Sequence, residues 1–180
     1  PLSSTLKSMK GVGELHFVRR TVLFLVGFAY FSAFGSLHYQ FPGLLSKSGV
    51  LPIDIFLSRV GGGKGWSLSE KISNLPTLVW LHEPLGVSVD SVAEWICLGG
   101  AALSATAMGL AIFTRGGGVK MLWATLFFLY LSMFNVGQTF LSFQWDILLL
   151  EVGFLCIFLP PTFRPTSRDP PNPLVLWLLR

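Results

Sequence analysis

The sequence predicts an all-α membrane protein: a bundle of about four transmembrane helices, with short interfacial helices in the first long loop. Composition is the first observation, since 52% of the 180 residues are hydrophobic and only 12% are charged, against about 25% charged in a typical globular domain. The second is that the apolar residues gather in separate stretches, each near the roughly 20 residues that cross a bilayer. The third is that Lys and Arg concentrate in the segments between these stretches. Together they exclude an ordinary soluble domain and a disordered chain.

The first apolar stretch follows a basic amino-terminal segment, residues 1–20, which carries four Lys and Arg residues. Residues 21–40 contain no acid or base except His38. At 1.5 Å per residue, about 20 helical residues cross a hydrocarbon core of about 30 Å. A signal peptide would have a shorter apolar stretch and a small-residue cleavage site. We therefore predict a retained membrane helix over 21–40.

The loop of residues 41–90 is mixed in charge, with four bases and four acids. Residues 52–60 begin with proline and place apolar residues on one helix face, which predicts a short helix that ends at the glycines from Gly61. Ser67 and Glu70 are spaced as a capping box, the reciprocal side-chain and backbone bonding that starts a helix. We expect a structured loop near the membrane surface.

The second span is predicted over residues 92–113, which are rich in small side chains. Small residues let two helix backbones approach closely in lipid, where close packing replaces the hydrophobic drive for association. We expect the stripe formed by Gly99, Ala102 and Thr106 to pack against a neighbouring helix.

The third span is predicted over residues 121–137 and the fourth over residues 141–160. A fourth helix that began at Ile147 would have only about 13 residues before the next prolines, so it must begin earlier to cross the bilayer. Spans one to four make a membrane domain over residues 21–161. Residues 162–180 form a Pro-rich linker and the entry to a further helix.

The distribution of bases predicts the orientation. Residues 1–20, the 114–120 turn and the 163–173 linker are all net positive, and the four-span topology places them on one side. The 41–90 loop is neutral and lies on the other side. The positive-inside rule then puts both termini on the cytosolic, or matrix-like, side.

The residues that would carry catalysis or metal binding do not form a recognisable pattern. His16, His38 and His82 lie on separate segments without paired ligand spacing, and no G-x-S-x-G nucleophile motif occurs. We therefore assign no catalytic, cofactor-binding or metal-binding residue. Cys97 and Cys156 lie at depths that differ by more than about 10 Å on this topology, beyond disulfide reach, so free thiols are expected.

Polar residues at the third and fourth spans form the one informative cluster: Asn135, Gln138, Gln144, Asp146 and Glu151. Ionisable groups inside a bilayer are costly and turn toward partners in the bundle. We interpret them as a structural polar cluster that joins the two spans, with a proton, ion or ligand site as the alternative. Asp146 and Glu151 are about 140° apart around a helix, so separate partners are expected. Asp146 would accept bonds from its own helix start or from the 41–90 loop, and Glu151 would meet Asn135 and Gln138.

Residues 135–157 resemble the signature of the lipase maturation factors, N-V-G-Q-x-F-L-x-F-Q-W-D-x-L-L-L-E-x-G-F-L-A-I. The resemblance covers about residues 18–180, and it includes further segments that are similar to the family: Phe31–Leu37, Gln40–Gly43, Ser48–Pro52, Pro76–Trp80 and Leu174–Arg180.

The resemblance implies a multi-span protein of the endoplasmic reticulum that assists folding and assembly of secreted lipases without being an enzyme. It implies membrane lipid, other membrane helices or subunits and secreted lipase clients as partners, and no nucleic acid. Family members are longer and carry a large luminal carboxy-terminal domain, so a fragment or a shortened relative is expected.

Two other functions remain open at this point. The chain could be a structural accessory subunit of a large membrane complex in a mitochondrion or plastid, because its aromatic spans and basic linker suit a subunit that fills grooves. A membrane enzyme that uses Asp146 and Glu151 is the third hypothesis. The family distantly resembles the membrane part of vitamin K-dependent carboxylases, but no matching catalytic lysine is found here.

Overall fold

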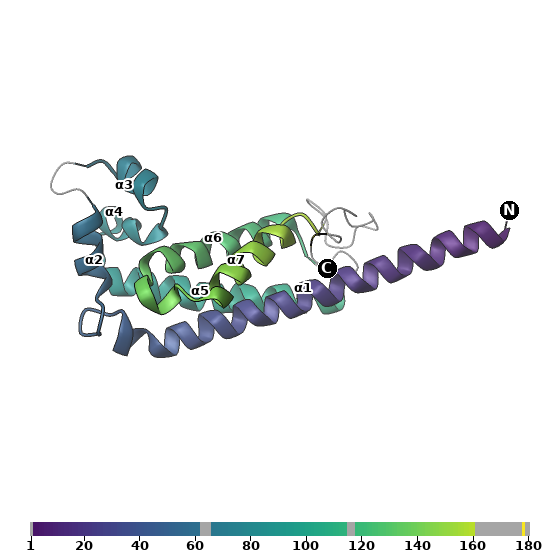
Figure 1. Ribbon diagram of the computed structural model, residues 1–180, viewed down its shortest axis with the longest axis horizontal. Helices are drawn as coiled ribbons and strands as arrows, with labels where there is room; N and C mark the ends of the chain where they lie inside the picture. Colours follow the sequence, from purple (N-terminus) through teal and green to yellow (C-terminus); the bar gives the residue numbers. More distant parts are fainter. Residues whose placement is uncertain (1, 62–65, 115–117, 161–177, 179–180) are drawn as a thin grey trace.

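The computed structural model describes residues 2–61, 66–114, 118–160 and 178, and every regular element in this part of the chain is helical (Figure 1). The elements are α1 (Leu2–Leu44), α2 (Ile53–Val60), α3 (Leu68–Asn74), the 3-10 helix η1 (Leu78–Leu81), α4 (His82–Leu85), α5 (Val89–Phe113), α6 (Lys120–Val136), the 3-10 helix η2 (Gln138–Leu141) and α7 (Gln144–Cys156). The predicted all-helical class is confirmed over these residues.

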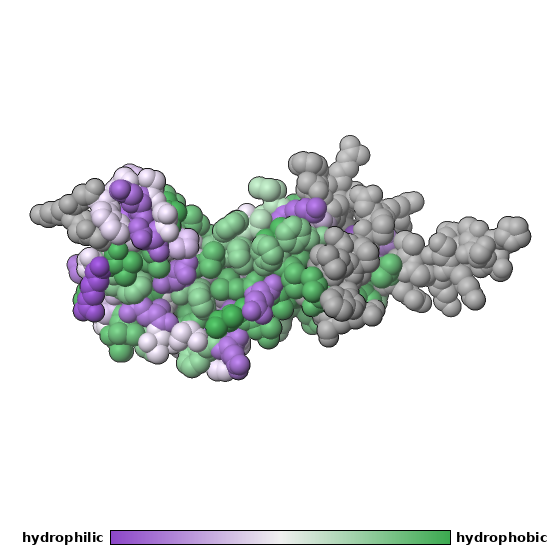
Figure 2. Space-filling model, turned by 45° about the horizontal axis from the view of Figure 1, so that its top comes forward, coloured by the Kyte–Doolittle hydropathy of each residue, from purple (hydrophilic) through white to green (hydrophobic). Residues whose placement is uncertain are grey.

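Four long helices form the bundle. α1 packs against α5 and α7, and α6 packs against the same two helices, so the four make a closed ring around a shared apolar core. The short elements α2, α3 and α4 gather at one end, while the amino-terminal part of α1 projects beyond the other end (Figure 1). Hydrophobic residues cover most of the middle of the visible face (Figure 2). The arrangement is that of a helical membrane domain with its connecting loop at one end.

Two of the four helices have the length and hydropathy of a membrane span: residues Leu15–Leu44 of α1, and α5. α6 has 17 residues and α7 has 13, which correspond to helices of about 25 and 20 Å against a hydrocarbon core of about 30 Å. The expectation of four complete spans therefore stays a prediction for α6 and α7.

Helix boundaries differ from the expectation at both ends of the bundle. α1 begins at Leu2, so the basic segment continues into the first span as one helix. The fourth helix begins at Gln144 instead of residue 141, because η2 occupies residues 138–141. Gln138 has a φ of 51°, a left-handed conformation that an α-helix cannot contain, which separates α6 from α7.

Three expectations fall wholly or partly outside the described residues. They are the glycines after Gly61, the middle of the 114–120 turn and nearly all of the 162–180 linker with its further helix.

The short helices of the loop are confirmed. α2 follows Pro52 and ends at Gly61, as its sequence predicts. Ser67 caps α3: its hydroxyl accepts the Glu70 backbone N–H, and its own N–H donates to the Glu70 carboxylate at 2.7 Å. The hydrogen bond from the Ser67 backbone N–H, and after it that from the Ser67 hydroxyl, hold the pKa of Glu70 below its usual value. The loop is therefore structured by local signals that the sequence carries.

The buried face of α5 begins at Val92, and its second half consists of small residues: Gly100, Ser104, Ala107 and Ala111. A Cβ at Gly100 would lie 2.6 Å from the ring of Phe34 on α1. Close contact between α1 and α5 therefore requires a residue without a side chain at Gly100.

The expected stripe of Gly99, Ala102 and Thr106 lies elsewhere on α5. A Cβ at Gly99 would meet nothing within 4 Å, and Ala102 and Thr106 are exposed. The contact expected for Gly99 is thus not made with any described helix, because Gly100 is the residue that faces α1. A contact of this stripe with residues outside the described part stays a prediction.

Gly100→Ala should destabilise the bundle relative to Gly99→Ala. Both variants gain about the same helix propensity, about 1 kcal/mol, but only the methyl at residue 100 clashes with Phe34. Overpacking of this kind costs about 1–3 kcal/mol. Thermal unfolding of the two variants in the same detergent measures the difference, and equal melting temperatures would contradict the packing.

Candidate functional site

A buried hydrogen bond joins α6 and α7 inside the bundle. The hydroxyl of Tyr130 donates to Oδ1 of Asp146 at 2.6 Å. Asp146 is only 6% exposed, and its second oxygen, Oδ2, is buried without a hydrogen-bond partner among the described residues. A buried acid depends strongly on each donor it has. The bond therefore sets which face of α7 points into the bundle.

Tyr30 brings α1 to the same place. Its hydroxyl donates to the backbone oxygen of Leu149 at 3.4 Å, and its ring packs edge-on against Tyr130 with centroids 5.6 Å apart. A Cβ at Gly153 would lie 1.8 Å from the Tyr30 hydroxyl, so only glycine allows this approach. Tyr30, Tyr130 and Asp146 together form what we call the interior lock.

A second set of bonds holds the loop against the carboxy-terminal part of α6. Thr77 donates its hydroxyl to the backbone oxygen of Ser132, and the Ser132 hydroxyl accepts the N–H of Leu78, both at 3.0 Å. Asn135 donates its amide to the backbone oxygen of Pro76 at 2.8 Å. These three bonds attach the segment before and within η1 to α6.

Gln138 attaches an earlier part of the loop. Its Nε2 donates to the backbone oxygen of Leu51 at 3.2 Å, next to the start of α2. Its left-handed backbone is the feature that ends α6 and begins η2. We call Thr77, Ser132, Asn135 and Gln138 the loop lock, since each bridges the loop and the α6–η2 segment.

The five residues of the predicted polar cluster are thus divided among different places. Asn135 and Gln138 bind loop carbonyls, and Asp146 belongs to the interior lock. Gln144 and Glu151 are exposed on the outer side of α7. The five do not form one network.

The expected partners of the two acids were wrong. Asp146 binds Tyr130 of α6, rather than its own helix start or the loop. Glu151 makes no hydrogen bond or ion pair in the described part of the chain, and the amides expected to meet it bind the loop instead. The reason is the angle of about 140° between the two acids: with Asp146 turned into the bundle, Glu151 is turned out of it.

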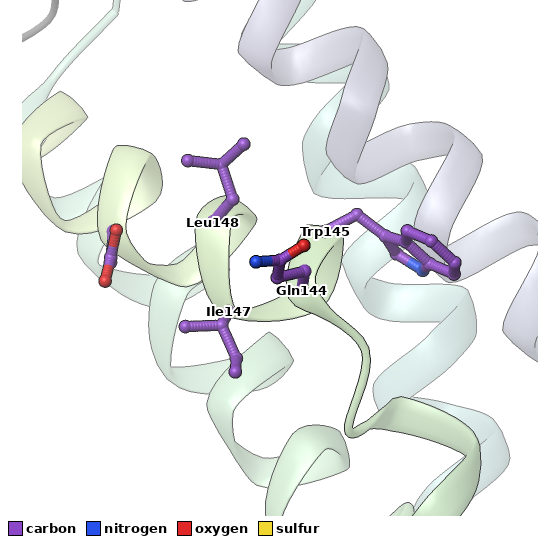
Figure 3. Close-up of a pocket in the computed structure, with 5 residues that line it drawn as sticks. Gln144, Trp145, Ile147 and Leu148 are labelled. Carbon is purple, nitrogen blue, oxygen red and sulfur yellow. The ribbon is translucent and has the colours of Figure 1, made fainter.

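A groove of about 570 Å³ lies along this outer side, lined by Gln144, Trp145, Ile147, Leu148 and Glu151, all from α7. Figure 3 shows Gln144, Ile147 and Leu148 projecting from neighbouring turns, with the Trp145 ring extending away from them. The groove is open, and it lies on the opposite face of the helix from Asp146.

Sequence reasoning missed both tyrosines, Thr77 and Ser132. A usable signal existed for Tyr130 and Tyr30, because a phenol hydroxyl in mid-span needs a partner when it is buried. No comparable local signal existed for Thr77 and Ser132, whose bonds join residues more than 50 positions apart.

The arrangement is suited to holding structure. Asp146 and Glu151 lie on opposite sides of α7 and cannot act on one ligand. Within the described ranges, no three His, Cys, Asp or Glu residues are grouped to hold a metal ion. Cys97 and Cys156 are both buried and unpaired.

Fold and site together define a helical membrane domain whose interior polar groups bind helix to helix and helix to loop. Residues 17–180 match the family described as the lipase maturation factor transmembrane domain. The chain belongs to the lipase maturation factor family.

Individual relatives agree with this assignment. The chain is 40% identical to lipase maturation factor 2 of Gallus gallus, over 88% of this chain and 22% of the relative. It is 37% identical to lipase maturation factor 2 of Homo sapiens, over 88% of this chain and 23% of the relative. It is 33% identical to lipase maturation factor 1 of Bos taurus, over 93% of this chain and 29% of the relative. The chain therefore spans less than a third of the length of these relatives. No solved structure matches it.

Tyr130→Phe should destabilise the protein by about 1.5–3 kcal/mol, because it removes the only donor to Asp146 that the described residues provide. Tyr39→Phe is the matched control, since Tyr39 is 86% exposed. Thermal unfolding in detergent compares the two, and a Tyr130 variant as stable as the control would contradict the interior lock.

Ser132→Ala should loosen the loop without unfolding the bundle. The Leu78 amide loses its acceptor, and its hydrogen exchange should rise by a factor of about 2 to 12, the equivalent of 0.5–1.5 kcal/mol. Thr125→Ala is the control, because the Thr125 hydroxyl donates to Met121 within α6. Unchanged exchange at Leu78 would show that the loop lock does not hold this segment.

Proposed function

We propose that the chain is the membrane domain of an endoplasmic-reticulum lipase maturation factor, which assists folding and assembly of secreted lipases without catalysing a reaction. The observation that carries this proposal is the family match over residues 17–180, which includes both locks. The relatives' names point to a lipase as the client. The separation of Asp146 from Glu151 supports a structural role over a catalytic one.

The proposed membrane placement has four spans, near residues 21–40, 92–113, 121–137 and 141–160. The amino-terminal part of α1 and the α5–α6 turn then lie in the cytosol, together with residues 162–180. The loop between α1 and α5 faces the lumen. Support comes from the antiparallel bundle, in which the loop and the α6–α7 connection share one end, and from the basic residues of the opposite side.

In this placement the loop lock has a functional meaning. It holds α2, η1 and α4 as a rigid surface at the luminal end of the bundle, where a secreted client would be met. The alternative, an accessory subunit of a mitochondrial or plastid complex, finds no support in the comparisons.

A complementation experiment tests the proposal. The protein, expressed from its full open reading frame in cells that lack their own lipase maturation factors, should restore secretion of active lipase. The measurement is lipase activity per amount of secreted lipase, with an unrelated secreted protein as the control for general secretion. Lipase activity no higher than with an empty vector would refute the proposal.

Loop-lock variants sharpen the same experiment. Asn135→Leu combined with Gln138→Leu should lower lipase maturation while the variant still accumulates, because the loop loses two of its anchors. Thr125→Ala should mature lipase like the parent.

A further inference from the structure

The outer face of α7 is a continuous helical stripe. Its members are exposed, and each lies three or four residues from another member: Gln144, Ile147, Leu148, Glu151 and Phe154. The opposite face of the same helix, with Asp146, Gly153 and Cys156, is buried against the bundle. α7 thus buries one face in the bundle. On its other face the ring of Phe154 contacts Phe127 of α6, with centroids 5.8 Å apart, and the stripe is otherwise exposed in the described part of the chain.

Glu151 lies in the middle of this stripe. Apolar side chains flank it on both sides, with Leu148 at 57% exposed and Phe154 at 48%. No described residue donates a hydrogen bond or forms an ion pair with it. A carboxyl group in mid-membrane that lacks a partner is costly, and such groups face protein and pair with another group.

We propose that the outer face of α7 docks a further membrane-spanning helix, apolar and carrying one Lys or Arg that pairs with Glu151. The proposal rests on the membrane placement given under the proposed function. The helix would come from the part of a full-length family member that this chain does not span.

Charge and position select this occupant. A basic side chain complements the carboxylate, and the apolar residues around Glu151 match the flanks of a membrane helix. The groove beside Glu151 provides room for a long side chain. The relatives are several times as long as the matched region, so a full-length family member has other segments from which this helix would come.

Two other occupants fit less well. A second copy packed about a twofold axis through the middle of this stripe would bring two Glu151 carboxylates together, and like charges repel. A secreted client would bind at an end of the bundle, whereas Glu151 lies in the middle of the outer face of α7.

Photocrosslinking in the full-length protein tests the proposal. A photoreactive amino acid replaces Leu148, and the control replaces Leu98 of α5, which is also apolar and 51% exposed. Mass spectrometry of the crosslinked peptides then identifies the contact. We expect an intramolecular crosslink from residue 148 to an apolar helix with a Lys or Arg.

Substitutions at Glu151 establish whether the pairing causes the contact. Glu151→Leu should reduce the crosslink about tenfold or more, because the basic partner loses its counter-ion. Glu151→Gln should keep more of it. Exchanging the charges, with Glu151→Lys and the partner base changed to Glu, should restore the crosslink.

Several outcomes would overturn the proposal: a crosslink to a second copy, to another protein or to lipid alone, or a yield at residue 148 no higher than at residue 98. An undiminished crosslink in Glu151→Leu would also overturn it. Thermal unfolding of each variant shows whether the bundle is folded. Since the crosslink does not depend on lipase maturation, its result stands apart from that of the complementation experiment.

Discussion

A buried hydrogen bond from Tyr130 to Asp146 is the contact on which the rest of the bundle depends. Asp146 is nearly fully buried, and a buried carboxyl group that lacks a hydrogen-bond donor is costly. The acid must therefore meet its donor, and α7 has one rotation about its own axis that allows this. The hydrogen bond thereby orients a helix whose apolar residues, which occupy nearly every position, would not select a face.

The orientation of α7 has consequences on both of its sides. On the inner side Gly153 reaches Tyr30, which brings α1 against α7 and closes the ring of four helices. On the outer side Glu151 is carried away from the bundle. A single rotation of α7 therefore buries Asp146 and exposes Glu151, five residues further along the helix.

The loop lock also consists of hydrogen bonds between distant segments, here at one end of the bundle. Loop carbonyls that would otherwise need water receive side-chain donors from α6 and η2, at Pro76 and Leu51. These donors, on α6 and η2, attach the loop to the end of the bundle. The loop thus forms a defined surface at one end of the bundle.

Composition and local spacing were enough to predict the helical class, a long apolar helix over residues 92–113, the helix that follows Pro52 and the capping box at Ser67, because each depends on residues close together in the chain. The choice of partners could not be predicted in that way. The angle between Asp146 and Glu151 predicted that they would not share a ligand, but which of them points inward depends on Tyr130, 16 residues away on another helix. Likewise, a stripe of small residues predicted close packing on α5, and only the position of Phe34 on α1 decided that Gly100, rather than its neighbour Gly99, makes the contact. The periodicity of a helix determines which residues share a face, whereas the face that is buried is decided by packing and hydrogen bonds with segments distant in the sequence.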